Sequence, residues 1–295
     1  MQQTRALAIQ RPISQVLWPR SSLAGCILGT FVRDTRGCEL TPAERMNFFS
    51  ASPYCSVSWF IEGQAHIVDW SPAEKKPTST TALPKLLFTG PQRRPIASWN
   101  PAPVYALITI FHADAIAALA GIDISTMLDR ICSADDALGG ELILACDALW
   151  RDGDPADRVR RFEDRLDPLW QLARPAGHIA THMLQDWTRT LAVRAATSGT
   201  GRSLRQVERR IRSWTGQSLR RLGQGVLTER THEISVLNRG KGLELARLAA
   251  EAGFADQSHM TRHIKRETGF TPDQLHARIE TDEAFWCYRL MGERF

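Results

Sequence analysis

The stretch LELARLAAEAGFADQSHMTRHIKRETGFTP runs from Leu243 to Pro272 and predicts two helices joined by a tight turn. In the first helix Leu245 and Leu248 recur at helical spacing and form an apolar inner face. Gly253 is expected to end this helix because glycine readily adopts a positive φ. Phe254 then fills the corner between the helices.

The second helix of this stretch has an apolar side and a polar side. Asp256 precedes it as an N-cap, and Met260 and Ile264 point inward at i and i+4. Its polar face carries Gln257, Ser258, Thr261, Arg262 and Lys265. Gly269 is expected to stop the helix, and Pro272 to open the next one.

These polar residues have the chemistry that reads double-stranded DNA. Gln and Arg can each make two hydrogen bonds to a base edge in the major groove, and Lys can neutralise a phosphate. A packed helical hairpin with a solvated charged face would show the same pattern, so the residues alone leave both interpretations open.

This stretch resembles the second helix-turn-helix of AraC/XylS-type transcriptional regulators, because its glycines, its Phe254 and its Thr-Pro pair stand at the same spacings as in that family. The resemblance covers about thirty residues and gives structural roles to Gly253, Phe254, Gly269 and Pro272. It implies DNA contacts by the polar face defined above. Met260 and Ile264 depart from the pattern, because the family normally has aromatic residues there.

Members of this family carry two such units joined by a long helix, and a fainter partner lies upstream. The run from Ser203 to Leu219 resembles the first recognition helix, with Gly216 in the turn after it. By this resemblance Arg205, Glu208 and Arg209 would reach base edges, with Arg212 on the same outward face. The turn before the helix lacks the family's compact entry, so an alternative is that this unit mainly clamps the DNA backbone. Residues 218–237 fit the connecting helix.

The distribution of charge along the chain agrees with a DNA-binding unit in its C-terminal part. The 295 residues carry a net charge of +5, and residues 1–200 hold 20 basic and 20 acidic side chains. Residues 201–278 hold 15 basic against 8 acidic side chains, whereas residues 279–295 hold 2 against 4. A positive field over one helical unit is typical of a phosphate-backbone binder, although ordinary basic helices look similar.

The first third of the chain has the pattern of β-structure. Residues 55–70 predict two strands around Gly63, residues 84–91 and 103–111 predict two more, and residues 71–81 predict a polar loop. Among the tryptophans, Trp59 and Trp99 could line a ligand pocket, as could Trp70, but core packing is the favoured interpretation. Apolar spacings of three and four then predict helices at residues 112–120, 124–131, 140–150, 156–173 and 178–195.

The predicted fold class is therefore mixed. Residues 1–174 form an α+β regulatory domain, residues 175–278 an all-α AraC-type double helix-turn-helix domain, and residues 279–295 an acidic, aromatic tail that packs back as a helix or contacts another protein. By analogy with the family, the first domain is a cupin-like barrel that binds an effector or mediates dimerisation. The resemblance implies promoter DNA and RNA polymerase as partners, a small-molecule effector, a homodimer, and transcriptional activation.

Several other classes of protein have little support in the sequence. The chain has no apolar run long enough to cross a membrane and no secretory signal, so a cytoplasmic protein is expected. Six cysteines without a CxxC pair and the lone pair His178 and His182 predict neither a metal site nor a cofactor. With no nucleotide loop or nucleophile motif, an enzyme is not expected. The alternatives are an N-terminal enzyme or sensor that uses the helix-turn-helix as an adaptor, and a protein-interaction module that has lost DNA binding.

Overall fold

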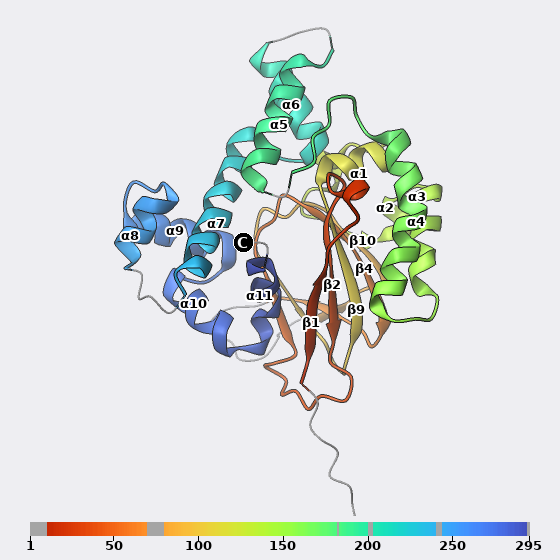
Figure 1. Cartoon of the computed structure of the whole chain (residues 1–295). Helices are drawn as coiled ribbons and strands as arrows, with labels where there is room; N and C mark the ends of the chain where they lie inside the picture. The colour runs from red at the N-terminus through yellow and green to blue at the C-terminus, as the bar shows by residue number, and fades with distance from the viewer. Residues whose placement is uncertain (1–10, 70–79, 182, 200–202, 240–243, 294–295) are drawn as a thin grey trace, which may run out of the picture.

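The computed structural model describes residues 11–69, 80–181, 183–199, 203–239 and 244–293. Two antiparallel β-sheets occupy the first part of the chain and helices the second, which confirms the mixed fold class. Figure 1 shows the sheets on one side of the molecule and the C-terminal helices along their flank. Among the described residues, no helix is long and apolar enough to cross a membrane.

The larger sheet has six strands. In spatial order they are β1 (Ile13–Leu17), β2 (Ile27–Asp34), β9 (Tyr105–Phe111), β4 (Cys55–Glu62), β7 (Leu86–Thr89) and β10 (Ile131–Ser133). The smaller sheet has, in order, β3 (Met46–Phe49), β8 (Ile96–Trp99), β5 (His66–Val68) and β6 (Thr80–Ala82). We call the two sheets together the β-sandwich.

The side chains of β4 show that the two faces of the larger sheet point into different interiors. Val57 and Trp59 are fully buried in the main core, whereas Ser58 and Phe60 face a cavity inside the β-sandwich. Successive side chains of a strand point to opposite faces, so β4 has one face on each core. Trp59 packs in the core and its indole nitrogen donates to the Cys146 carbonyl at 3.1 Å.

Helices cover the outer face of the larger sheet (Figure 1). They are α1 (Ala113–Ala120), α2 (Ala134–Ala137), α3 (Gly140–Asp147) and α4 (Pro155–Ala173). Phe162 of α4 packs against Trp59 with ring centroids 5.3 Å apart. This contact joins the helical layer to the sheet.

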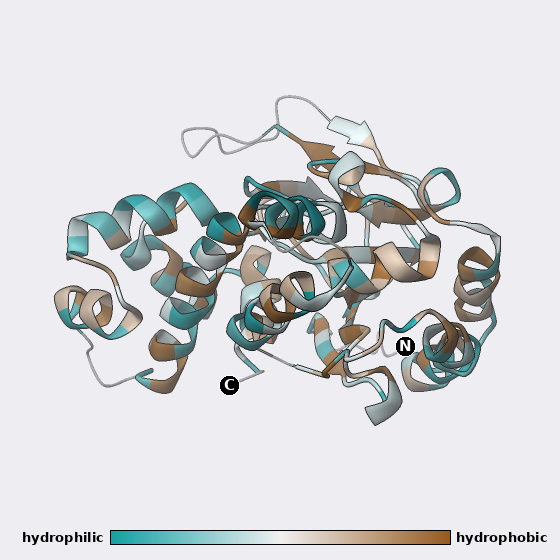
Figure 2. Cartoon of the chain, turned by 90° about the horizontal axis from the view of Figure 1, so that it is seen from above, coloured by the Kyte–Doolittle hydropathy of each residue, from teal (hydrophilic) through white to brown (hydrophobic). Residues whose placement is uncertain are grey.

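The remaining helices are α5 (Leu184–Thr197), α6 (Leu204–Thr215), α7 (Leu219–Leu237), α8 (Leu245–Ala252), α9 (Gln257–Thr268), α10 (Pro272–Thr281) and α11 (Trp286–Gly292). In Figure 1, α7 links α5 and α6 at one end to α8 and α9 at the other. Figure 2 shows that the hydrophobic stretches of these helices lie mainly toward the interior and the hydrophilic stretches mainly outside.

One hydrophobic core runs across residue 174. Leu184, Trp187 and Leu191 of α5, Ile211 of α6 and Leu222 of α7 are buried in the same cluster as the larger sheet. The helices that follow residue 174 therefore depend on the β-rich region for part of their packing.

Three sequence predictions differ from the structure. Residues 124–131 form a 3-10 turn, Ile124–Met127, followed by strand β10 rather than a helix, because Ile131 pairs with Thr89 at the sheet edge. The helix predicted from residue 178 begins at Leu184. Strands β1, β2, β3, β6 and β8 were not predicted. Thr80 and Thr81, at the end of the predicted loop, belong to β6 because they pair with β5, whereas Trp70 and the rest of that loop lie outside the described residues.

Candidate nucleic-acid interface

The second helix-turn-helix unit, α8 and α9, has fully capped ends at its turn. Gly253 caps α8 with a φ of 92°, and the Phe254 amide donates back to the Ala249 carbonyl at 2.9 Å. Asp256 caps α9, its carboxylate accepting from the His259 amide at 2.6 Å. These caps satisfy backbone groups that the helix ends would otherwise leave unpaired, and they fix the angle between the helices.

The inner face of α9 packs on α8 and α7. Met260 and Ile264 are buried in a small core with Phe254. His263, also buried, bonds through Nε2 to the Thr228 hydroxyl at 2.9 Å and through Nδ1 to Arg266 at 3.0 Å. Since the Arg266 guanidinium can only donate, Nδ1 accepts and Nε2 carries the proton.

A buried ion pair connects α9 to α7. The two terminal nitrogens of the Arg221 guanidinium donate to Glu267, each at 2.6 Å, and Arg266 donates to the same carboxylate at 3.0 Å. Burial raises the pKa of Glu267, but the hydrogen bonds from Arg221 and Arg266 and the charge of Arg221 outweigh it, so the pKa is lowered overall. The carboxylate therefore stays ionised, and it holds α9 in place on α7.

On the outer face of α9, the predicted reading residues lie together. Gln257, Ser258, Arg262 and Lys265 are exposed and Thr261 is half-buried. Residues three and four apart in a helix share one side, so these five form a continuous polar surface over two turns. Gly269 ends α9 with a φ of 86°, and Pro272 follows at the start of α10 with Thr271 as its N-cap.

In the first unit, α6 begins with a capping box formed by Ser203 and Gln206. Arg210 donates to the Ala195 carbonyl at 2.8 Å and so ties α6 to the last turn of α5. Ile211 is fully buried at the centre of this contact. Part of the atypical turn between these helices, residues 200–202, lies outside the described residues.

The outward residues of α6 divide into two groups. Arg205, Arg209 and Arg212 are exposed. Glu208, by contrast, is half-buried, accepts from the Leu219 amide at the start of α7 at 3.4 Å and lies 4.0 Å from Arg212. A carboxylate at a helix N-terminus is stabilising, so Glu208 has an intramolecular partner in addition to its predicted base contact.

A buried carboxylate of the β-rich region anchors the first unit. Asp114 of α1, 2% exposed, accepts from the Trp187 indole at 2.9 Å and from Arg194 at 2.7 Å, both on α5. Gly216, at the end of α6, lies close to the 3-10 turn at Ile124–Met127. A Cβ at this position would stand 3.2 Å from the Ile124 carbonyl oxygen. The first unit is therefore seated directly on α1 and the 3-10 turn.

The described part of the chain contains no cluster of three or more His, Cys, Asp or Glu side chains that could hold a metal ion. His178 precedes α5 rather than lying in a helix, and His182 is outside the described residues. Burial raises the pKa of all six cysteine thiols, to about 12 for Cys287, so they remain protonated at neutral pH.

Two cavities adjoin helix α11, and one of them also borders the second unit. One of about 350 Å³ lies between the loop at residues 50–54 and helices α7 to α11. Another of about 170 Å³ lies inside the β-sandwich and is lined mostly by apolar side chains, with Arg33 and Asn47 among its polar groups. Tyr288 of α11 contributes to the walls of both.

A family model described as a helix-turn-helix domain matches residues 197–278. No curated protein matches the chain in sequence. Among solved structures, the chain is similar to an apo variant of ToxT from Vibrio cholerae, with 9% identity, a TM-score of 0.38, and 84% of this chain and 96% of that chain covered. Another similar structure is ToxT bound to an unsaturated fatty acid, with 12% identity, a TM-score of 0.34, and 78% and 94% covered.

The matched residues take in α6 to α10, the part of the chain that holds both predicted recognition helices. The chain thus has the AraC-type helix-turn-helix domain of DNA-binding transcriptional regulators.

Sequence reasoning missed the contacts that fix the two units in place. Asp114, Arg221 and Glu267 are ordinary charged residues in the sequence, and their roles depend on partners 46 to 80 positions away. A signal was available for Glu267 alone, since helical spacing places it on the same inner face as Met260 and Ile264.

Proposed function

We propose that this chain binds promoter DNA with α9 in one major groove and α6 in the next. The observation that carries the proposal is the exposed polar face of α9, presented by a capped and internally packed two-helix unit. An ordinary helical hairpin needs no such concentration of base-reading side chains, and the five residues at the groove-facing positions all have donors or acceptors that suit base edges or phosphates.

The length of α7 supports a reader of two successive grooves. Its 19 residues span about 28 Å at about 1.5 Å per residue. Major grooves on one face of DNA recur at about 34 Å. With one unit packed at each end of α7, a single chain covers two half-elements about one helical turn apart.

Individual roles follow from side-chain chemistry. In this proposal Arg262 and Gln257 bind base edges, Ser258 and Thr261 make shorter polar contacts, and Lys265 neutralises a phosphate. On α6, the base-edge residues are Arg205, Glu208 and Arg209, and Arg212 contributes positive charge. Glu208 would then exchange its bond to the Leu219 amide for a base contact, which makes α6 the weaker reader.

The β-rich region would act as the regulatory part of a cytoplasmic activator. We propose that it takes a small-molecule effector or a second copy of the chain, and that the DNA-bound protein presents a surface to RNA polymerase. The cavity of about 350 Å³ supports an effector, because an occupant there would touch α7 and α11 directly. The proposal gives the chain no catalytic step.

Selection of bound sequences from a random duplex pool by the full-length protein tests this function. We expect a site with two half-elements about one turn apart. Arg262→Ala should lose discrimination at one base pair, by about 1 to 3 kcal/mol. Arg247→Ala, an exposed arginine on α8 that pairs with Glu251, is the matched control and should select the wild-type site. Failure of the wild-type protein to enrich any sequence, with and without candidate effectors, would contradict the proposal and favour a protein-interaction module.

A further inference from the structure

The C-terminal segment, residues 282–293, returns from the second helix-turn-helix unit to the β-sandwich. It consists of a 3-10 turn, Glu283–Phe285, and helix α11. Figure 1 shows α11 lying beside strand β1, between the β-sandwich and the DNA-binding helices. Trp286 is 1% exposed and Phe285 is fully buried, so the segment is part of the core.

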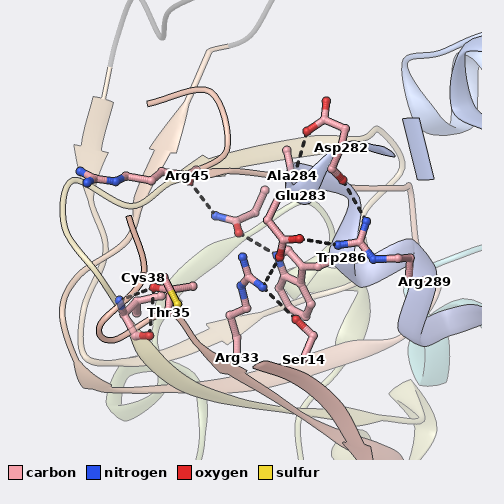
Figure 3. A network of polar contacts seen from close by, with 12 residues as sticks. Ser14, Arg33, Thr35, Cys38, Arg45, Asp282, Glu283, Ala284, Trp286 and Arg289 are labelled. Atoms are coloured by element: carbon pink, nitrogen blue, oxygen red, sulfur yellow. Dashed lines mark hydrogen bonds and ion pairs between the residues drawn. The ribbon is translucent and has the colours of Figure 1, made fainter. Parts of the chain in front are cut away.

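Polar contacts at the β-sandwich end of this segment are specific (Figure 3). Arg33 of β2, itself 3% exposed, donates to Glu283 at 2.6 Å and to Ser14 at 2.9 Å. The Trp286 indole donates to the Asn47 side chain at 2.8 Å, and the Arg33 guanidinium lies 5.3 Å from the Trp286 ring centre. A buried guanidinium whose charged partner comes from the end of the chain is costly to separate from it.

The same segment also contacts the second unit. Phe285 packs against Phe48 of β3 and against Phe270, at ring distances of 5.1 and 5.0 Å. Phe270 lies two residues after Thr268, the last residue of α9. On the other side, His232 of α7 bonds to the Tyr288 carbonyl at 3.1 Å. The segment therefore joins three parts: the β-sandwich, the end of α9, and α7.

One backbone hydrogen bond joins the second unit directly to the β-rich region. The Ala51 amide, in the loop after β3, donates to the Glu267 carbonyl of α9 at 2.8 Å. The first unit is anchored on the same β-rich region through Asp114. Each unit thus has its own attachment to one scaffold, in addition to their shared helix α7.

We propose that the C-terminal segment is a positioning element that holds the second unit on the β-sandwich and thereby sets the spacing between the two recognition helices. This inference rests on the proposed two-groove reading. Four acidic side chains among residues 279–295 agree with a segment that lies on protein rather than on phosphate. Without the segment, the second unit would be held on the β-rich region mainly through α7 and the loop contact at Ala51, and its orientation would vary.

The test uses full-length protein with Trp286→Ala, and with Glu283→Gln as a milder variant in case the first does not fold. Trp18→Ala, at a tryptophan that is 52% exposed, is the matched control. Hydrogen exchange of the Ala51 amide should be about tenfold faster in both segment variants and unchanged in the control. The Gly216 amide, bonded within the first unit at 2.7 Å, should exchange at the wild-type rate in all of them.

Half-site spacing supplies the second readout. In one test site the spacing between the half-elements is lengthened by about two base pairs. Wild-type protein should bind this lengthened site at least about tenfold more weakly than the selected site. Each segment variant should bind it only about two- to threefold more weakly than the site that the variant itself binds best. Unchanged Ala51 exchange would overturn the proposal, and so would faster exchange with a wild-type spacing penalty. If the wild-type protein selects no DNA, the proposed function fails, while the exchange measurement still decides whether the segment holds the second unit.

Discussion

Arg262 and Lys265 lie one turn apart on the exposed face of α9, and their different head groups predict different defects. The planar guanidinium of Arg262 can bind guanine at two points, whereas the Lys265 ammonium acts as a point charge. Lys265→Ala should weaken binding to all sequences alike and lower the slope of log affinity against log salt by about 1. Titrations at several salt concentrations measure this slope, and a defect confined to one base pair would contradict the phosphate role.

His263 predicts a pH dependence of stability at the residue scale. Burial lowers its pKa, although Glu267 nearby favours the charged form, and a proton on Nδ1 would face Arg266. The unfolded chain therefore binds more protons below about pH 6.5, and His263 loses its contribution to stability as the pH falls from about 7 to about 5. The stability difference between wild type and His263→Gln should shrink over that range in urea denaturation, with exposed His276→Gln as control. A constant difference would contradict this assignment.

Two glycines in the helices should respond to alanine in opposite directions. Gly253 caps α8 with a φ of 92°, where alanine is strained even though the nearest atom, Leu227 Cδ2, leaves 3.7 Å for a Cβ. Gly253→Ala should cost about 1 to 2 kcal/mol. Gly223 lies inside α7 with no atom within 4 Å of a Cβ, so Gly223→Ala should gain about 0.5 to 1 kcal/mol. Urea denaturation measures the change in the free energy of unfolding for each variant and so checks the two signs. Equal changes in both variants would show that packing rather than φ determines the effect of alanine.

At the level of elements, the sequence predicted most where the structural signals are local. Asp256, Gly253 and Gly269 mark helix ends through backbone conformation and capping, which depend on a few neighbouring residues, and the helices around them were predicted. Strand β10 was missed because its structure depends on pairing with β7, more than 40 positions earlier. The exposed face of α9 followed from helical spacing alone. By contrast, no local pattern could show that Glu208 contacts Leu219 or that Trp286 returns to Asn47.

Across the whole molecule, the two recognition units share their support with the β-rich region. Asp114 holds α5, Glu267 links α9 to both α7 and the loop at Ala51, and Glu283 reaches Arg33 on β2. The division at residue 174 remains a prediction about sequence organisation. Whether the two sides of this division unfold separately depends on how many buried side chains pack across it, because cooperative unfolding follows shared packing rather than chain order.

The shared core predicts one cooperative unfolding transition for the full-length chain. Leu184, Trp187, Leu191, Ile211 and Leu222 would all lose buried contacts if the helices separated from the β-rich region. Each fully buried apolar side chain of this size contributes about 1.5 to 3 kcal/mol, so a state with only one part folded should be scarcely populated. Calorimetry should give a van't Hoff enthalpy close to the calorimetric one. Two resolved transitions, with the first abolishing the Ala51 to Glu267 contact, would show instead that the second unit detaches before the rest unfolds.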